Sequence, residues 1–207
     1  MIPRGDIDGL VLAGGRSRRM RAEGGPAVDK GLLMLDGAPL VQWVAQYMKP
    51  WVGDVYISAN RRLDVYGRYG HCISDDPEFG GDAGPLAGVA SVMARSRRPW
   101  LLVLPVDVPR LPTELPTRLI EAVGGGAPLA YACAGTKAHP LCMLVRRDLV
   151  GDLRTYLLDG GRKVLDWHRR HDAVPVDFGD GPDLFRNINT PDDWAQAGGT
   201  RIETEPR

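Results

Sequence analysis

The stretch Ile7-Asp8-Gly9-Leu10-Val11-Leu12, followed directly by Ala13-Gly14-Gly15-Arg16-Ser17-Arg18-Arg19-Met20, decides the fold class of this chain. Its first six residues form a mostly apolar run that predicts a buried strand, and the glycines after it cannot continue a strand well. A second apolar run, Trp100–Pro105, predicts a central strand covered on both faces. The chain therefore begins as a buried strand that ends in a glycine-rich loop.

The rest of the chain alternates between short apolar runs and apolar residues at helical spacing. Pro39 is expected in the first turn of one helix, Thr113 at the N-cap of another, and Thr190 at the N-cap of the last. Such alternation predicts an α/β layered fold with a mainly parallel central sheet. Further strands are predicted at 54–58, 129–134 and 141–145, and helices near 40–48, 86–93, 115–123, 148–159, 163–170 and 191–197.

Composition and charge exclude several classes of protein. The 26 Lys and Arg residues balance 26 Asp and Glu residues, so a nucleic-acid binder, which needs surplus positive charge, is not expected. No secretory signal and no apolar run of membrane-spanning length is found, so we expect no membrane partner. The three cysteines form no CxxC pair, which indicates free thiols in a reducing compartment and predicts a cytoplasmic protein.

The loop after the first strand has the composition of a phosphate-binding loop. Glycines let backbone N–H groups approach an anion closely, because no Cβ intervenes. The cations Arg16, Arg18, Arg19 and Lys30 could neutralise a triphosphate. The alternative is a flexible surface loop with solvated arginines, but the position after a buried strand favours phosphate binding. The loop is not a Walker A sequence, since GxxxxGK[ST] is absent.

A carboxylate follows the second apolar run. Asp107 lies two residues beyond Pro105, where a buried strand of a parallel sheet would present its ligand-binding end. Mg²⁺ binds through one or two carboxylates plus substrate phosphates, so one well-placed aspartate can suffice. A turn or helix-capping aspartate before Pro109 is the alternative. Together with the glycine loop, the metal site is the better hypothesis.

Two further polar segments are candidates: one follows the predicted strand 54–58, and the other follows a strand end expected at Ser74. Asn60 ends the segment Ser58-Ala59-Asn60, and the pair Asp75-Asp76 precedes the glycine-rich stretch 80–88. Guanine presents N–H donors at N1 and N2, and a carboxylate can accept hydrogen bonds from both. An aspartate here could therefore recognise that base. Asn and Asp are also common turn residues, and each signal is weak by itself.

Taken together, the motifs resemble the molybdenum cofactor guanylyltransferases, part of a wider nucleotidyltransferase group with a Rossmann-like fold. The resemblance extends from about residue 7 to residue 198. The segments that carry it, in chain order, are LAGGRSRRM (12–20), DKGLLMLDGAPL (29–40), SANRR (58–62), SDD (74–76), GPLAG (84–88), LPVDVPRLP (104–112), AHPL (138–141), GGRKV (160–164) and FRNINTPDDW (185–194).

The resemblance implies a three-layer Rossmann-like nucleotidyltransferase fold. No repeat or low-complexity linker divides the chain, so we expect a single domain over 1–199, and the polar segment 200–207 predicts a frayed tail. The resemblance also implies a role for each matching residue. The nucleotide would lie along Leu12, Ala13 and Gly14, with its phosphates at Gly15 and Lys30 and its nucleoside at Asn60 and Asp75. Asp107 would hold Mg²⁺, and catalysis would depend on Lys30, Asp107 and Arg19. Asn187 and Asn189 would lie near the pterin.

The implied reaction joins GMP from GTP to molybdopterin or Mo-molybdopterin and releases diphosphate. The reactivity of the pterin also leads us to expect handover from molybdenum-cofactor delivery proteins. The alternatives are a molybdopterin cytidylyltransferase, whose relatives tend to carry AAG where this chain has Ala13-Gly14-Gly15, and a non-catalytic nucleotide-binding module. The segment 21–28 is longer than in the family, and either Asp75 or Asp76 could fill the base-reading position.

Two histidine-containing patches fall outside these motifs. His168 and His171 flank Arg169 and Arg170 at a predicted helix end, which indicates a solvated face or, alternatively, a contact for a pterin phosphate or a partner protein. His139, between Cys133 and Cys142, fits no zinc-ligand spacing, so these three residues are expected in strands or the core.

Overall fold

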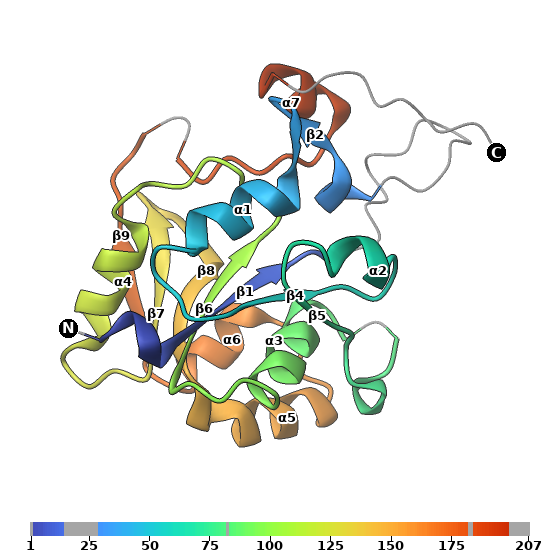
Figure 1. Ribbon diagram of the computed structural model, residues 1–207. Coiled ribbons are helices and arrows are strands. Elements are labelled where there is room, and N and C mark those ends of the chain that lie inside the picture. The colour runs from blue at the N-terminus through green and yellow to red at the C-terminus, as the bar shows by residue number, and fades with distance from the viewer. Residues whose placement is uncertain (1, 15–28, 82, 182–183, 199–207) are drawn as a thin grey trace.

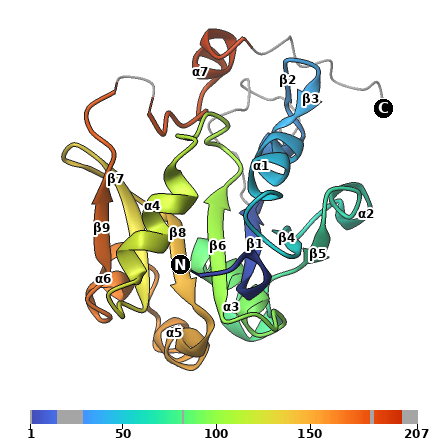
Figure 2. The same cartoon turned by 60° about the vertical axis from the view of Figure 1, so that its left-hand side comes forward.

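The computed structural model describes residues 2–14, 29–81, 83–181 and 184–198, and within them it contains a seven-stranded sheet (Figures 1 and 2). The strand order is β5-β4-β1-β6-β8-β7-β9, so the first strand of the chain lies near the middle of the sheet. The strand bounds are β1 Ile7–Leu12, β4 Val55–Ser58, β5 His71–Ile73, β6 Trp100–Pro105, β7 Leu129–Ala134, β8 Lys137–Arg146 and β9 Val174–Asp177.

The sheet is mixed, with the parallel half formed by β5, β4, β1 and β6. Strand β8 runs antiparallel to both β6 and β7, and it is joined to β7 as a hairpin at 135–136. Strand β9 is parallel to β7. The predicted α/β fold with a mainly parallel sheet is confirmed, and the strand predicted at 141–145 is the second half of the longer β8.

Helices cover both faces of the sheet and make three layers. One core cluster packs α1 (Leu40–Met48) and α4 (Leu115–Val123) on one face, and Trp194 of α7 (Pro191–Gln196) joins it from beyond the strand ends (Figure 1). The other packs α3 (Pro85–Met93), α5 (Val150–Leu158) and α6 (Val164–Arg169) on the opposite face (Figure 2). Strand β1 contributes alternate side chains to the two clusters, which explains why its sequence is apolar on both faces.

Gly9 interrupts that apolar strand for a steric reason. A Cβ at Gly9 would lie 3.2 Å from both the Met48 and the Val52 side chains, so glycine lets α1 and the segment after it approach the sheet closely.

The predicted helices form, with two corrections at the level of single residues. Helix α4 begins after Glu114, which takes the N-cap position in place of the predicted Thr113. His168 is 1% exposed, so the prediction of a solvated face at this helix end is wrong for that residue. Its helix is only six residues long, and its buried side packs Trp167 and His168 toward Tyr131 of β7.

Short elements surround the carboxyl ends of the parallel strands. The chain resumes at Asp29 with a single 3-10 turn, Lys30–Leu32, and a small hairpin of β2 (Met34–Leu35) and β3 (Ala38–Pro39). Both views place α7 beside this hairpin (Figures 1 and 2). The four-residue helix α2, Leu63–Tyr66, follows β4. Among the described helices, none has the length and apolar character needed to cross a membrane.

Candidate active site

The loops that leave the four parallel strands converge at one edge of the sheet. Backbone hydrogen bonds extend the strand pairing beyond the strands themselves: Ala13 and Gly14 both donate to the carbonyl of Ser58, each at 2.9 Å, and Val106 donates to the carbonyl of Leu12 at 3.0 Å. Parallel α/β sheets bind ligands at this edge. The sequence motifs at 12–14, 58–60 and 104–107 are therefore held side by side by main-chain bonds.

A cation and a carboxylate meet at one corner of this edge. The Lys30 ammonium donates a 2.6 Å hydrogen bond to Oδ1 of Asn189 and lies 3.5 Å from a carboxylate oxygen of Asp107. The side chains of Lys30 and Asp107 are 16% and 22% exposed, so both are confined but reachable. Burial raises the pKa of Asp107, and the neighbouring Lys30 opposes that shift. We refer to Lys30, Asp107 and Asn189 as the phosphate corner.

The start of α7 brings Asn189 to this corner. Oδ2 of Asp193 accepts hydrogen bonds from the amides of Asn189 and Thr190, at 3.0 and 2.9 Å, and the Thr190 hydroxyl accepts from the Asp193 amide at 3.1 Å. This is a complete capping box, as the Thr190-Pro191 sequence predicts. The amide of Ile188 donates to the Asp107 carbonyl at 2.8 Å. The resemblance implies that Asn189 lies near the pterin, and the structure joins it to Lys30.

A second group of side chains lies on the other side of β1. Asn60 and Asp75 are joined twice: the Asn60 amide donates to Asp75 at 2.8 Å, and the Asp75 backbone amide donates to Oδ1 of Asn60 at 2.9 Å. The Ser58 hydroxyl donates more weakly to Asp75, at 3.4 Å. A Cβ at Gly88 would overlap the Ser58 hydroxyl and lie 3.3 Å from Asp75, so glycine is needed there for space. We refer to Ser58, Asn60 and Asp75 as the nucleoside corner.

Asp76 is directed away from this corner. Its amide donates to the Ser91 hydroxyl at 2.8 Å, and its carboxylate lies 3.7 Å from the guanidinium of Arg154 on α5. Of the two aspartates that the sequence left open, Asp75 is thus the one that contacts Asn60. Sequence reasoning missed Ser58 and Gly88 as parts of the corner, although GPLAG was recognised as a motif.

Several predicted site residues lie outside the described residues, namely Gly15, Arg16, Arg18 and Arg19. Leu12 and Ala13 are described and buried, at 7% and 8% exposure. A Cβ at Gly14 would be no closer than 3.7 Å to its neighbours, so packing alone does not require glycine there. A ligand that approaches the backbone closely would supply the missing reason.

The phosphate corner has the donor chemistry of a magnesium site. Within the described residues, no group of three or more His, Cys, Asp or Glu side chains could hold a metal ion. Mg²⁺ does not need such a group, because it takes one or two carboxylates and completes its shell with water and substrate phosphates. Asp107, whose partly exposed carboxylate offers hard oxygen ligands, fits that role.

Two further buried polar atoms belong to Asn187, which is close in sequence to Asn189 of this corner, and to His139, which lies at the same end of the sheet. Oδ1 of Asn187 and Nε2 of His139 have no hydrogen-bond partner among the described residues. The His139 ring stacks on Phe185 with 4.7 Å between centroids, and burial lowers the pKa of His139. Cys133 and Cys142 are unpaired. This stacking gives His139 a packing role at the start of the 185–189 segment.

Comparisons with known proteins show the family of the chain. The family model of the MobA-like NTP transferase domain matches residues 9–174. A molybdenum cofactor guanylyltransferase of Shewanella loihica is 38% identical over 191 residues, which cover 92% of this chain and 94% of that protein.

Solved structures show the same fold at lower identity. The molybdopterin-guanine dinucleotide biosynthesis protein A of Archaeoglobus fulgidus superposes with a TM-score of 0.73 at 24% identity, over 92% of this chain and 96% of that one. The Mycobacterium tuberculosis protein Rv0371C, solved in complex with manganese, superposes with a TM-score of 0.68 at 17% identity, over 93% and 98% of the two chains. Fold, motif order and sequence identity together place this chain in the MobA-like NTP transferase family, among the molybdenum cofactor guanylyltransferases.

Proposed function

We propose that this protein transfers GMP from GTP to molybdopterin or its molybdenum-loaded form and releases diphosphate. The observation that carries the proposal is the pair of corners flanking β1, with Lys30 and Asp107 on one side and Asn60 and Asp75 on the other. A nucleoside triphosphate lying across the end of β1 would place its base and its phosphates on opposite sides. The activity for which the Shewanella loihica relative is named supplies the acceptor.

The reaction is a displacement at phosphorus. A terminal phosphate oxygen of the pterin attacks the α-phosphorus of GTP, a new P–O bond forms, and the bond to the leaving diphosphate breaks. The attacking phosphate is already ionised at neutral pH, so the protein needs no strong general base. The obstacle is the approach of two anions, which positioned positive charge can offset.

This chain's own residues supply part of that charge. Lys30 would exchange its contacts with Asn189 and Asp107 for a phosphate of the nucleotide. Asp107 would hold a divalent cation, which supplies charge to the phosphates when bound. We infer Mg²⁺ for this site from the hard carboxylate oxygens of Asp107, and the Mycobacterium tuberculosis protein of the same fold was itself solved in complex with a divalent ion, manganese.

The nucleoside corner favours guanine over cytosine. The Asp75 carboxylate can accept from two adjacent N–H donors, and guanine presents such a pair at N1 and N2. Cytosine presents one amino donor beside two acceptors, which a carboxylate would repel. Asn60 holds Asp75 in place through its two hydrogen bonds, so the carboxylate is positioned before the base arrives.

The test is a panel of nucleotides followed by turnover. We expect GTP with Mg²⁺ to raise the thermal midpoint, by roughly 5–10 °C at 100 times the dissociation constant. CTP and ATP should shift it much less, and GTP with molybdopterin should then yield the guanine dinucleotide and diphosphate. A thermal shift selective for CTP would contradict guanylyl transfer and indicate cytidylyl transfer instead. GTP binding without transfer to any molybdopterin form would reduce the protein to a nucleotide-binding module.

A further inference from the structure

Tyr66 makes a buried hydrogen bond next to the phosphate corner. Its hydroxyl donates to Oδ1 of Asp29 at 2.5 Å, and the tyrosine is 1% exposed. Tyr66 is the last residue of α2, whereas Asp29 is the residue directly before Lys30. The bond therefore joins the segment after β4 to the backbone that carries the catalytic lysine.

Asp29 is available for this bond because of its local geometry. It occupies the N-cap position of the Lys30–Leu32 turn, but within the described residues its side chain does not cap that turn. Its carboxylate accepts from Tyr66 instead. Burial, and next the hydrogen bond to Asp29, raise the pKa of the Tyr66 phenol far above its usual value, so the hydroxyl stays a donor at every physiological pH.

Gly31 shows how closely the tyrosine lies over the turn. A Cβ at Gly31 would overlap the Tyr66 hydroxyl and touch its ring carbons. Gly31 is not among the residues with positive φ, so glycine is required here for space and not for backbone conformation. Tyr66 thus contacts the residues on both sides of Lys30.

Lys30 is consequently held from two directions. Tyr66 and Asp29 fix its backbone, and Asn189 receives its ammonium at 2.6 Å. The contact between Lys30 and Asn189 must break when a phosphate binds the ammonium, whereas the hydrogen bond between Tyr66 and Asp29 can persist through the reaction. Positioning contributes strongly to phosphoryl chemistry, and a displacement of about 1 Å can cost about 10²-fold in rate.

We propose that Tyr66 is a positioning residue for Lys30, acting through Asp29 to hold the lysine where it meets the nucleotide phosphates. The proposal rests on the proposed function, since it assigns Lys30 to the phosphates of GTP. It also gives the segment that carries Asn60 a second role, because the same chain that forms the nucleoside corner positions the phosphate corner through α2.

The experiment is a double-mutant cycle of Tyr66→Phe with Lys30→Ala. Tyr66→Phe keeps the ring on Gly31 and removes only the hydroxyl. We expect kcat/KM for GTP to fall about tenfold in the single variant, and to fall no further when Tyr66→Phe is added to Lys30→Ala, because a positioning effect has nothing left to position. Equal losses in both backgrounds would overturn the proposal.

Tyr47→Phe is the matched control. Its hydroxyl also donates a 2.5 Å bond, to the carbonyl of Pro112, and burial likewise raises the pKa of its phenol. We expect this variant to lose thermal stability comparably to Tyr66→Phe and to keep kcat/KM within about twofold. An activity loss in Tyr47→Phe as large as in Tyr66→Phe would mean that a general loss of packing explains both, and would also overturn the proposal.

Substitutions of Asp29 provide a second test if Tyr66→Phe folds poorly. Asp29→Asn retains an oxygen acceptor for the Tyr66 hydroxyl and should keep most of the activity, whereas Asp29→Ala should match Tyr66→Phe. Equal activity of the two Asp29 variants would contradict the role of the hydrogen bond.

Dissociation constants for GTP are measured on the same variants. If the wild-type chain binds GTP but transfers no GMP, only the proposed function is rejected. The positioning role of Tyr66 is then tested by the same double-mutant cycle, with dissociation constants for GTP in place of kcat/KM. If the wild-type chain does not bind GTP, both proposals fail.

Discussion

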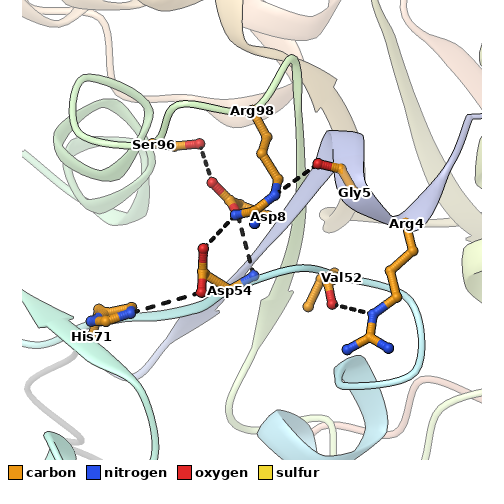
Figure 3. Close-up of polar contacts among 8 residues, drawn as sticks. All are labelled: Arg4, Gly5, Asp8, Val52, Asp54, His71, Ser96 and Arg98. Atoms are coloured by element: carbon orange, nitrogen blue, oxygen red, sulfur yellow. Dashed lines mark hydrogen bonds and ion pairs between the residues drawn. The ribbon is translucent and has the colours of Figure 1, made fainter.

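The two ends of the parallel half of the sheet both concentrate charge, but in opposite ways. At the amino end, the Asp8 carboxylate of β1 is 0% exposed and fully engaged (Figure 3). The Ser96 hydroxyl donates to it at 2.6 Å, the Asp54 amide donates at 3.3 Å, and the Arg98 guanidinium bonds both Asp8 and the Asp54 carboxylate. The Arg98 bond lowers the pKa of Asp54.

At the carboxyl end, the carboxylate of Asp107 has no such set of partners among the described residues. Its charged neighbour is Lys30 at 3.5 Å, whose hydrogen bond goes to Asn189 instead. Burial raises the pKa of Asp107. A buried charge saturated by rigid partners makes the fold depend on each of those partners, whereas one that is partly exposed and incompletely paired can exchange partners with a ligand. The comparison predicts that function and stability separate between the two ends.

The largest expected effect is at the carboxyl end. Asp107→Ala should lower kcat at least about 10³-fold, equal to about 4 kcal/mol of barrier, because the proposed divalent ion would lose its protein ligand. The free energy of unfolding should not fall, since the variant removes an incompletely paired buried charge. Transfer assays with a Mg²⁺ titration and urea denaturation measure both. Asp148→Ala, which removes an exposed carboxylate paired to Arg146, is the control. Mg²⁺-dependent transfer at the wild-type rate in Asp107→Ala would remove the metal assignment.

The amino end should show the reverse. Arg98→Met leaves the Asp8 carboxylate buried without its guanidinium and should lower the free energy of unfolding by about 3–4 kcal/mol. Activity per folded molecule should be unchanged, because the cluster is at the opposite end of β1 from the site. The double variant Asp8→Val with Arg98→Met removes the buried charge as well, and should recover much of the loss. If the double variant is no more stable than Arg98→Met, buried charge is not the cause.

A third region, around His168, shows that a buried polar group without hydrogen-bond partners does not by itself make a functional site. Neither ring nitrogen of His168 has a hydrogen-bond partner among the described residues, and its ring packs 4.9 Å from Tyr131. Burial, followed by the charge of His171, lowers the pKa of His168 to about 4. The unfolded chain, with a histidine pKa near 6.5, takes up the proton first as pH falls.

Stability should therefore fall between pH 6.5 and pH 4, by about 2 kcal/mol already at pH 5. His168→Phe should remove this part of the pH dependence, measured by urea denaturation at pH 7 and pH 5, and should leave GMP transfer at pH 7 unchanged. His71→Phe is the control, because the His71 side chain is 67% exposed. The same pH dependence in wild type and His168→Phe would show that other groups cause it.

The elements predicted best from sequence are those whose burial is symmetric. Strands β1, β6 and β7 have the predicted bounds, because each forms a mostly apolar run that ends at a turn or loop. The antiparallel insertion of β8 and the four-residue strand β9 could not be predicted, since strand order and direction depend on contacts between distant segments. His168 was misjudged because two arginines follow it, while the helix turns its other side to the core.

The candidate site also contains residues that the sequence can predict and contacts that it cannot. Lys30, Asn60, Asp75 and Asp107 could be named from motifs, because each follows a predicted strand or the glycine loop. Their partners could not. Asn189 is 159 residues from Lys30 along the chain, and the Tyr66–Asp29 bond spans 37 residues. Such contacts depend on side-chain packing that no local pattern records.

The capping box at the start of α7 also separates the parts of the site in time during synthesis. Lys30 and the four parallel strands, which end at Pro105, leave the ribosome before Asn189 has been made. Asn189 is held only once Asp193 has followed it. A chain made only as far as Pro105 therefore lacks the group that receives the lysine, and the phosphate corner is complete only after Asp193 has been added.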